Sequence, residues 1–372
     1  MADNKKEVNV HIIHSMKGGC GKSTCALFKA IQIAFNEGID DKRAKVLFID
    51  ADFKGSAMKK LLFERDSAEE TGNSKNERMP KIGEIEKDVQ DYSRRAKVEE
   101  GVGQYHSLAI PNDFENHITL SDYLRDSSKY SIQDVICHSC SYTTIGKAEE
   151  GSPKESDEDS GQRKLNSKLG LKQPYYINGY IDFMLSSTSA ESKDWFRYKE
   201  GKIPAGVYRW RMDTIIRNIL KIGSVNDEAA GTYTDIVVDM PPGYDEYSDI
   251  LLELLRKNAQ KEDKLKLHYY AVTTEDIGHT TLTKNNIKKL IADNAKYKSF
   301  ASINIILNAV SIEEFKALED NQKKDYRNWL KLDNALKGSL YLNENSASYH
   351  KFCRTRKEEG FEQDISKVIK EI

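Results

Sequence analysis

The chain has 372 residues, of which 38% are hydrophobic and 31% charged, and its formal net charge is −2. These values indicate a well-solvated globular protein with a sizeable core, and the mean hydropathy of −0.66 argues against apolar membrane spans. The charge balance gives no general attraction to nucleic acid, and five unevenly spaced cysteines do not suggest a disulfide framework, so we expect a cytoplasmic protein.

The N-terminal quarter of the sequence begins with a strand pattern, a glycine-rich turn and a helix pattern. Residues Val8–His14 alternate and then run apolar, Ser23–Phe35 has helical periodicity, and Lys45–Asp50 is a second apolar run that ends in an acid. This order of strand, loop, helix and strand is typical of a sheet with parallel strands.

Later segments continue the alternation. Further strands are expected at Ile181–Leu185, Asp235–Asp239, His268–Val272 and Ile303–Asn308, and helices at Thr119–Leu124, Tyr208–Ile222, Ile250–Leu255 and Leu282–Ala292. The sequence therefore predicts one α/β domain over residues 1–372, with a doubly wound, mainly parallel sheet and long insertions.

Two segments are predicted to be insertions. Residues 64–116 are polar with weak periodicity, and residues 128–175 include a Ser-, Glu-, Lys- and Gly-rich stretch at 147–170 that is expected to be a flexible surface loop.

The turn after the first strand has the composition of a phosphate-binding loop. Gly18, Gly19 and Gly21 would let backbone N–H groups approach phosphate oxygens without Cβ clashes. Lys22 would neutralise β- and γ-phosphate charge, and Ser23 would hold Mg²⁺ at the start of the following helix. With Cys20 and Thr24 in the same stretch, these residues predict an ATP and Mg²⁺ site in a P-loop NTPase fold.

The loop departs from the standard pattern G-x-x-x-x-G-K-[ST] because Met16 stands at the first glycine position and Lys17 follows it. The segment instead resembles the deviant Walker A ATPases of the ParA/MinD family, whose motif is K-G-G-x-G-K-[ST]. In that family the extra lysine, here Lys17, reaches the partner's nucleotide across a dimer interface and supplies a catalytic cation in trans.

A second segment is similar to the family motif D-x-D-P-Q-G-N-A-T. It aligns without gaps with Asp50–Met58, so the resemblance implies that Asp52 positions or activates the attacking water and that Asp50 supports the magnesium shell. Phe53, Lys54, Ser56 and Met58 depart from the motif. Lys54 places a cation where the family usually has an amide.

Two further positions match the family in order along the chain. Asp239, before Met240–Gly243, would hold magnesium through water, and the loop after it would sense the γ-phosphate. Asn308, at a strand end, matches the adenine-contacting asparagine, although an asparagine there is also an ordinary turn former.

The resemblance implies an ATP hydrolase that acts as an ATP-dependent dimerising switch in DNA partition or cargo positioning. The partners it implies are a second copy of the chain, non-specific DNA and an activating protein. The C-terminal residues 365–372 have helical spacing but no aromatic anchors, so we expect a helix docked on the core rather than on a membrane.

Two other functions fit parts of the sequence. Cys137 and Cys140 have the C-x-x-C spacing of metal sites, which would suit a metal-cluster scaffold or carrier ATPase. The other two ligands of such a site could come only from His350 and Cys353. Free thiols are the simpler interpretation. An ATP-dependent ligase on the same fold would leave Lys17 without a role.

Overall fold

The computed structural model describes residues 7–36, 44–54, 58, 62, 104–109, 117–145, 175–186, 196, 202–221, 233–262, 264–292, 299–308, 340–343 and 369–371. The strands are β1 (Val8–His14), β2 (Ala44–Asp50), β3 (Gln104–Ala109), β4 (Cys140–Ile145), β5 (Tyr175–Met184), β6 (Asp235–Asp239), β7 (Leu265–Thr273), β8 (Ser302–Asn308), β9 (Leu340–Asn343) and β10 (Ile369–Glu371). The helices are α1 (Lys22–Asn36), α4 (Leu120–Arg125), α5 (Ile132–Val135), α8 (Ala205–Lys221), α9 (Glu246–Lys261) and α10 (Ile277–Ala292).

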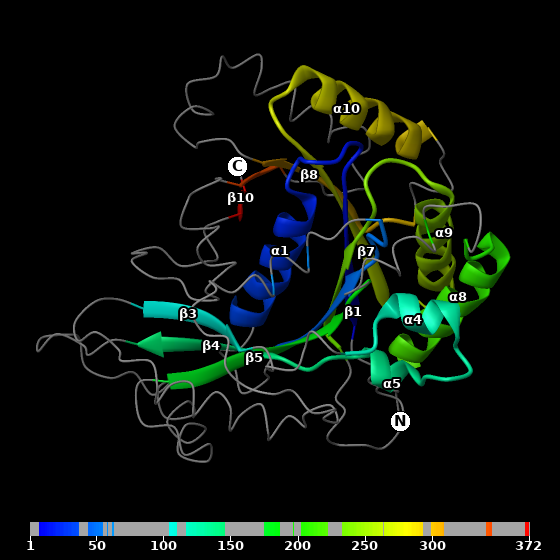
Figure 1. Ribbon diagram of the computed structural model, residues 1–372. Helices are drawn as coiled ribbons and strands as arrows, with labels where there is room; N and C mark the ends of the chain where they lie inside the picture. Colours follow the sequence, from blue (N-terminus) through cyan, green and yellow to red (C-terminus); the bar gives the residue numbers. More distant parts are fainter. Residues whose placement is uncertain are drawn as a thin grey trace, which may run out of the picture.

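The described strands form one sheet in the order β10-β9-β8-β7-β1-β6-β2-β5-β4-β3. Figure 1 shows the edge made by β3, β4 and β5 and, farther along the sheet, β1, β7 and β8. The run from β9 to β5 is parallel, and antiparallel pairs occur only at its two edges. The predicted doubly wound, mainly parallel α/β fold is confirmed. The central strands β6 and β8 are buried along their whole length, as expected for strands covered on both faces.

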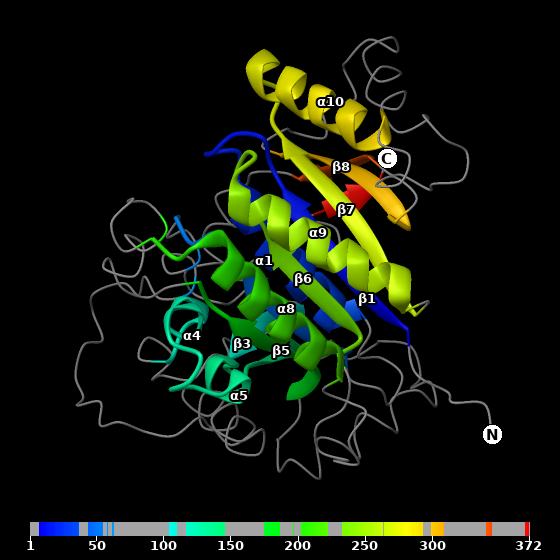
Figure 2. The same cartoon turned by 90° about the vertical axis from the view of Figure 1, so that its right-hand side faces the viewer.

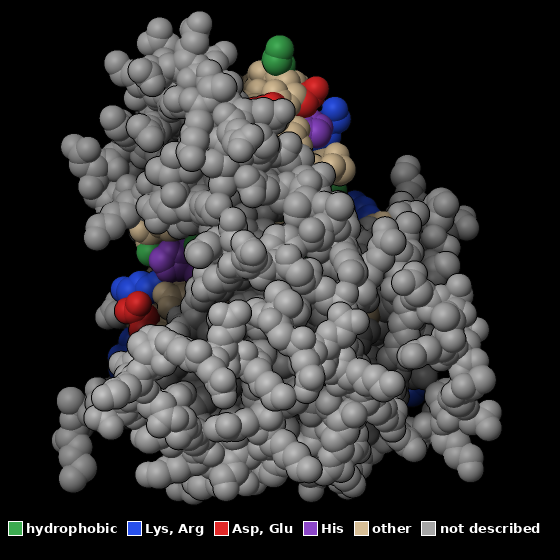
Figure 3. Space-filling view, turned by 90° about the vertical axis from the view of Figure 1, so that its left-hand side faces the viewer, with side chains coloured by type: hydrophobic (Ala, Val, Ile, Leu, Met, Phe, Trp, Pro, Cys, Tyr) green, Lys and Arg blue, Asp and Glu red, His purple; other side chains and the backbone are tan. Residues whose placement is uncertain are grey.

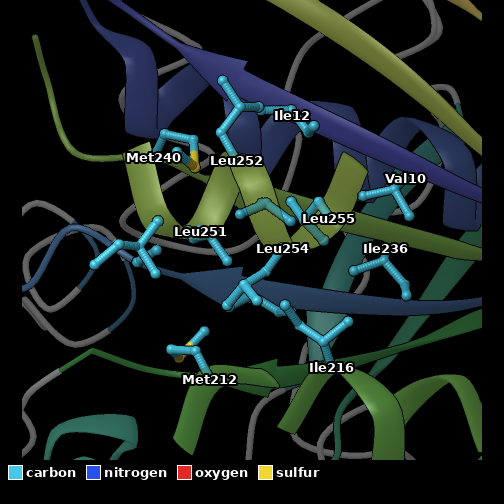
Figure 4. Packing of buried hydrophobic residues seen from close by; sticks show 14 of the residues in the cluster. Val10, Ile12, Met212, Ile216, Ile236, Met240, Leu251, Leu252, Leu254 and Leu255 are labelled. Atoms are coloured by element: carbon cyan, nitrogen blue, oxygen red, sulfur yellow. The ribbon is translucent and has the colours of Figure 1, made fainter. Parts of the chain in front are cut away.

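Helices cover both faces of the sheet. Helix α1 packs on one face, while α8 and α9 lie side by side on the other, with α4 and α10 flanking them (Figure 2). Figure 4 shows leucines of α9, among them Leu252 and Leu255, in one buried cluster with Val10 and Ile12 of β1 on that second face.

The helix predicted at Thr119–Leu124 is confirmed as α4. Helix α4 begins after Thr119, whose hydroxyl accepts from the Asp122 N–H while the Asp122 carboxylate accepts from the Thr119 N–H. These two hydrogen bonds form a capping box. Helix α9 begins after Asp245 with the same kind of reciprocal pair with Ser248.

The sequence missed the edge strands. Strands β3 and β4 lie inside the two predicted insertions and extend the sheet beyond β5, while residues 147–170 lie outside the described residues. The predicted C-terminal helix is wrong at residues 369–371, which pair antiparallel with β9. Apolar residues three and four positions apart do not distinguish a helix from a strand in so short a segment. Here pairing with β9 makes the segment a strand.

The described surface has few large exposed hydrophobic side chains. Those that are exposed include Trp210, Tyr244, Ile277 and Leu282. In the space-filling view of one side, the described residues show charged and histidine side chains with little hydrophobic surface (Figure 3). Among the described helices, none combines the length and apolarity that crossing a bilayer requires.

Candidate nucleotide site

The carboxyl ends of β1, β2 and β6 bring the predicted phosphate-binding residues together. In the sheet register, Asp50 of β2 is the partner of Asp239 of β6, which is also the partner of Ile13 in β1. Alternation along β2 and β6 turns both aspartates toward the face that α1 covers. Parallel strands thus place two distant acids beside the loop that begins α1.

Two glycines of the predicted phosphate loop have a backbone conformation that favours glycine. Gly19 and Gly21 have φ values of 84° and 78°, in the left-handed region. A Cβ at Gly21 would lie 2.1 Å from the Asn308 amide nitrogen, whereas a Cβ at Gly18 would meet nothing within 4 Å. Gly21 is therefore required by both conformation and space, and Gly18 by neither.

Lys22 lies at the centre of the acidic group. Its Nζ is 2.5 Å from Asp239 Oδ1 and 3.6 Å from Asp52 Oδ2, and it donates to Ser23 Oγ at 3.2 Å. Burial disfavours the ammonium, but Asp239 and Asp52 outweigh it and raise the pKa of Lys22. One cation therefore faces several carboxylates.

The acids carry more negative charge than Lys22 balances. Burial, then the charges of Asp239 and Asp52, raise the pKa of Asp50 to about 7. Burial also raises the pKa of Asp239, against the effect of Lys22. Asp239 Oδ2 is buried and has no hydrogen-bond partner in the described part of the chain. The raised pKa values of Asp50 and Asp239 and the unpartnered Asp239 oxygen indicate a place where a further cation would be stabilised.

The donor set fits Mg²⁺ held together with phosphates. Within the described ranges, no three His, Cys, Asp or Glu side chains are spaced to hold a metal alone. Mg²⁺ commonly binds through one or two carboxylates, with waters and substrate phosphates completing its shell. Ser23, Asp50 and Asp239 are the residues that would contribute, and Gly18 and Gly19 leave open space for the phosphates.

The remaining predicted residues lie around this centre. Lys17, Gly18 and Gly19 are exposed, while Cys20 is buried. Asn308 donates its amide to the Cys20 carbonyl at 2.7 Å, so it lies against the phosphate loop. Thr24 is partly buried in the first turn of α1.

Lys17 does not join the acidic group around Lys22. Its charge instead contributes to lowering the pKa of the exposed Asp276, after the larger effect of the hydrogen bond from the His279 N–H. Lys17 thus lies at the open rim of the site, beside the start of α10.

Ser186 is a site residue that the sequence did not reveal. Its hydroxyl donates to Asp50 Oδ2 at 2.7 Å, and the Asp52 N–H donates to Asp50 Oδ1 at 3.1 Å. Ser186 follows β5, which is the neighbour of β2 in the sheet. The signal that could have found it is a polar residue directly after a parallel strand, where ligand sites of such sheets gather.

Phe53 and Lys54, which depart from the family motif, have structural partners. The Phe53 ring stacks on Phe196 with centroids 4.4 Å apart and meets Tyr208 edge-on. Lys54 Nζ lies 2.7 Å from Asp245 Oδ2. Both contacts join the loop after β2 to the helices on the second face.

The alternative metal site gains no support from the described residues. Cys137 is buried, and its backbone bridges to Phe183 of β5. His138 Nδ1 lies 2.8 Å from the Asp182 carboxylate. The Cys140 side chain, His350 and Cys353 lie outside what the structure describes, so that alternative stays untested.

No protein-family model matches the chain, and no curated protein matches it. Solved structures with a similar fold include a Cyanothece McdA variant in complex with ATP, at 10% identity and a TM-score of 0.42 over 95% of this chain and 89% of that one. A plasmid partition protein from Borrelia burgdorferi is 14% identical, with a TM-score of 0.42 over 94% of this chain and 95% of that one. The cell division protein MinD from Aquifex aeolicus is 13% identical, with a TM-score of 0.44 over 97% of this chain and 93% of that one. At these values the likeness does not bear on function.

Proposed function

We propose that the chain is a ParA/MinD-like ATPase that binds ATP with Mg²⁺ at Gly18–Thr24 and hydrolyses it as an ATP-dependent dimerising switch. The observation that carries this proposal is the meeting of Lys22 with Asp50, Asp52 and Asp239 at the mouth of the phosphate loop. A buried ammonium and an excess of carboxylate beside a glycine loop suit a phosphate chain and its metal.

Each residue has a role that its position supports. Lys22 would bind the β- and γ-phosphates, and Asp52, at the loop edge with 13% of its side chain exposed, could orient the attacking water. Bound Mg²⁺ would neutralise charge on the phosphate oxygens. Asn308 would form one wall of the loop and could reach the adenine.

The exposed position of Lys17 supports a role across a dimer. Its charge lies away from the Lys22 cluster, where a second subunit could bring it toward the other nucleotide. DNA or cargo, together with an activating protein, would then be bound or released according to the nucleotide state. This is the part of the proposal that the resemblance suggests.

Paired lysine variants test the proposal. Lys22→Ala should abolish ATP binding in a calorimetric titration, while Lys17→Ala should keep ATP binding but lose ATP-dependent dimerisation and turnover. Asp52→Ala should bind ATP, turn over slowly and accumulate as a dimer in gel filtration. Undiminished affinity of Lys22→Ala would refute the site, and an Asp52→Ala protein that stays monomeric with ATP would refute the switch.

A further inference from the structure

A chain of buried hydrogen bonds connects helix α10 to the loop that follows Asp239. Asn286 of α10 donates its amide to the Tyr269 hydroxyl of β7 at 2.9 Å. The Tyr269 hydroxyl lies 2.7 Å from His14 Nδ1, and His14 Nε2 lies 2.7 Å from the Gly243 carbonyl oxygen. All three side chains are at most 2% exposed.

The partners fix the direction of every bond in this chain. The Tyr269 hydroxyl accepts from the Asn286 amide, so its own proton is directed to His14 Nδ1. His14 then carries its proton on Nε2 and donates it to the Gly243 carbonyl, which can only accept. Burial lowers the pKa of His14 to about 4, which keeps this neutral tautomer at physiological pH.

The series of hydrogen bonds ends at Gly243, which is also hydrogen-bonded to the segment that leads into the phosphate loop. Its N–H donates to the Ser15 carbonyl at 2.7 Å, and its φ of 75° requires glycine. Gly243 is therefore bonded on both sides to the end of β1, through Ser15 and through the His14 ring. The two segments that would flank a γ-phosphate are held at one separation.

We infer that His14, Tyr269 and Asn286 are positioning residues that fix the loop Met240–Gly243 against the phosphate loop and connect it to α10. This inference deepens the proposed function, because it assigns the residues that set the γ-phosphate-sensing loop. None of the three is among the residues proposed to contact the nucleotide or its metal. A displacement of Gly243 would be transmitted to α10, whose start lies next to Lys17 and Asp276. A displacement of α10 would in turn be transmitted to Gly243.

The neighbouring tyrosine of β7 provides a matched control. Tyr270 points to the opposite face, where its hydroxyl lies 3.4 Å from Nδ1 of His11, and it is 5% exposed against 1% for Tyr269. Tyr269→Phe and Tyr270→Phe remove the same atom from adjacent buried residues, each beside a histidine of β1. Only the first interrupts the path to Gly243.

Hydrogen exchange measured by mass spectrometry tests the inference without relying on turnover. The Gly243 amide should exchange about fivefold faster in Tyr269→Phe than in wild type and be unchanged in Tyr270→Phe. If the two variants exchange alike, the inference is overturned. Should Tyr269→Phe fold poorly, Asn286→Leu removes the amide that orients the hydroxyl, together with a buried oxygen, Asn286 Oδ1, that has no hydrogen-bond partner in the described structure.

Kinetics then separate positioning from structure. Tyr269→Phe should lower kcat for ATP about fivefold while the nucleotide Kd stays within about twofold, and Tyr270→Phe should change neither. A Kd that rises with an unchanged kcat would contradict a positioning role. A wild-type protein without ATPase activity would refute the proposed function, and the exchange experiment would still decide the inference.

Discussion

Lys54 Nζ lies 2.7 Å from Asp245 Oδ2, which joins the residue two places after Asp52 to the N-cap of α9. Lys54 stands where the family motif has an amide. The Asp245 pKa is lowered because the Lys54 contact and the Ser248 N–H outweigh partial burial. The loops after β2 and β6 are thus linked on the side away from α1.

A double-mutant cycle measures the strength of this link. Lys54 and Asp245 are 40% and 22% exposed, so screening limits their coupling in urea unfolding of Lys54→Met and Asp245→Asn to about 0.5–1 kcal/mol. The exposed pair of Lys202 and Glu246, 3.5 Å apart, is the control and should show almost no coupling. Equal coupling in the two pairs would mean that Lys54 does not restrain the loop.

Two glycine substitutions in the phosphate loop should differ sharply. Gly21→Ala places a Cβ 2.1 Å from the Asn308 amide at a φ of 78°, so it should cost about 2 kcal/mol or more and weaken ATP binding at least about tenfold. Gly18→Ala meets nothing within 4 Å and should leave stability almost unchanged. Thermal unfolding and nucleotide titration check both, and equal losses would show that the loop geometry differs from the one described.

Stability should depend on pH through His14. Its folded pKa of about 4 lies below the unfolded value of 6.5, so its contribution is fully present above pH 6.5 and is lost as the pH falls toward 4. Between pH 7.5 and 5 this loss amounts to about 2 kcal/mol. In His14→Gln the difference between urea midpoints at pH 7.5 and pH 5 should shrink. A difference as large as in wild type would assign the effect to other groups, such as His268, whose pKa burial also lowers to about 4.

Removing the Ser186 hydroxyl should weaken magnesium binding. The Ser186 hydrogen bond favours the ionised form of Asp50, so Ser186→Ala should raise the pKa of Asp50 above about 7 and move the acidic limb of the activity profile to higher pH. At pH 7 the Mg²⁺ requirement for ATP hydrolysis should rise about three- to tenfold. Ser121→Ala is the control, because the Ser121 hydroxyl donates to the Ser186 carbonyl and not to Asp50. Identical magnesium dependence in both variants would remove Ser186 from the site.

The cysteine alternative has its own experiment. If Cys137 and Cys140 held a metal cluster, the purified protein would contain stoichiometric metal that Cys137→Ser loses. Since Cys137 is buried and bridges to β5, we expect no such metal and a modest loss of stability instead. Metal analysis of both proteins decides between the two functions.

The sequence by itself determined the parallel core and the glycine-rich turn after β1. Apolar runs that end in Asp50, Asp239 and Asn308 became central strands because both of their faces are covered, and such runs need no long-range information to be recognised. Likewise the glycines and Lys22 are adjacent in the chain, so their geometry is local. The helix predicted at Thr119–Leu124 is likewise local, since Thr119 and Asp122 form its capping box.

Only the tertiary structure decided which distant side chains meet. Ser186 reaches Asp50 because β5 is the neighbour of β2, and Lys54 reaches Asp245 because two separate loops converge. His14 appears in sequence as one more residue of an apolar strand. Its role depends on Tyr269 and Gly243, more than 200 positions away, and strand order brings them together. The edge strands were hidden for the same reason, since short edge segments are stabilised by the pairing partner rather than by their own pattern.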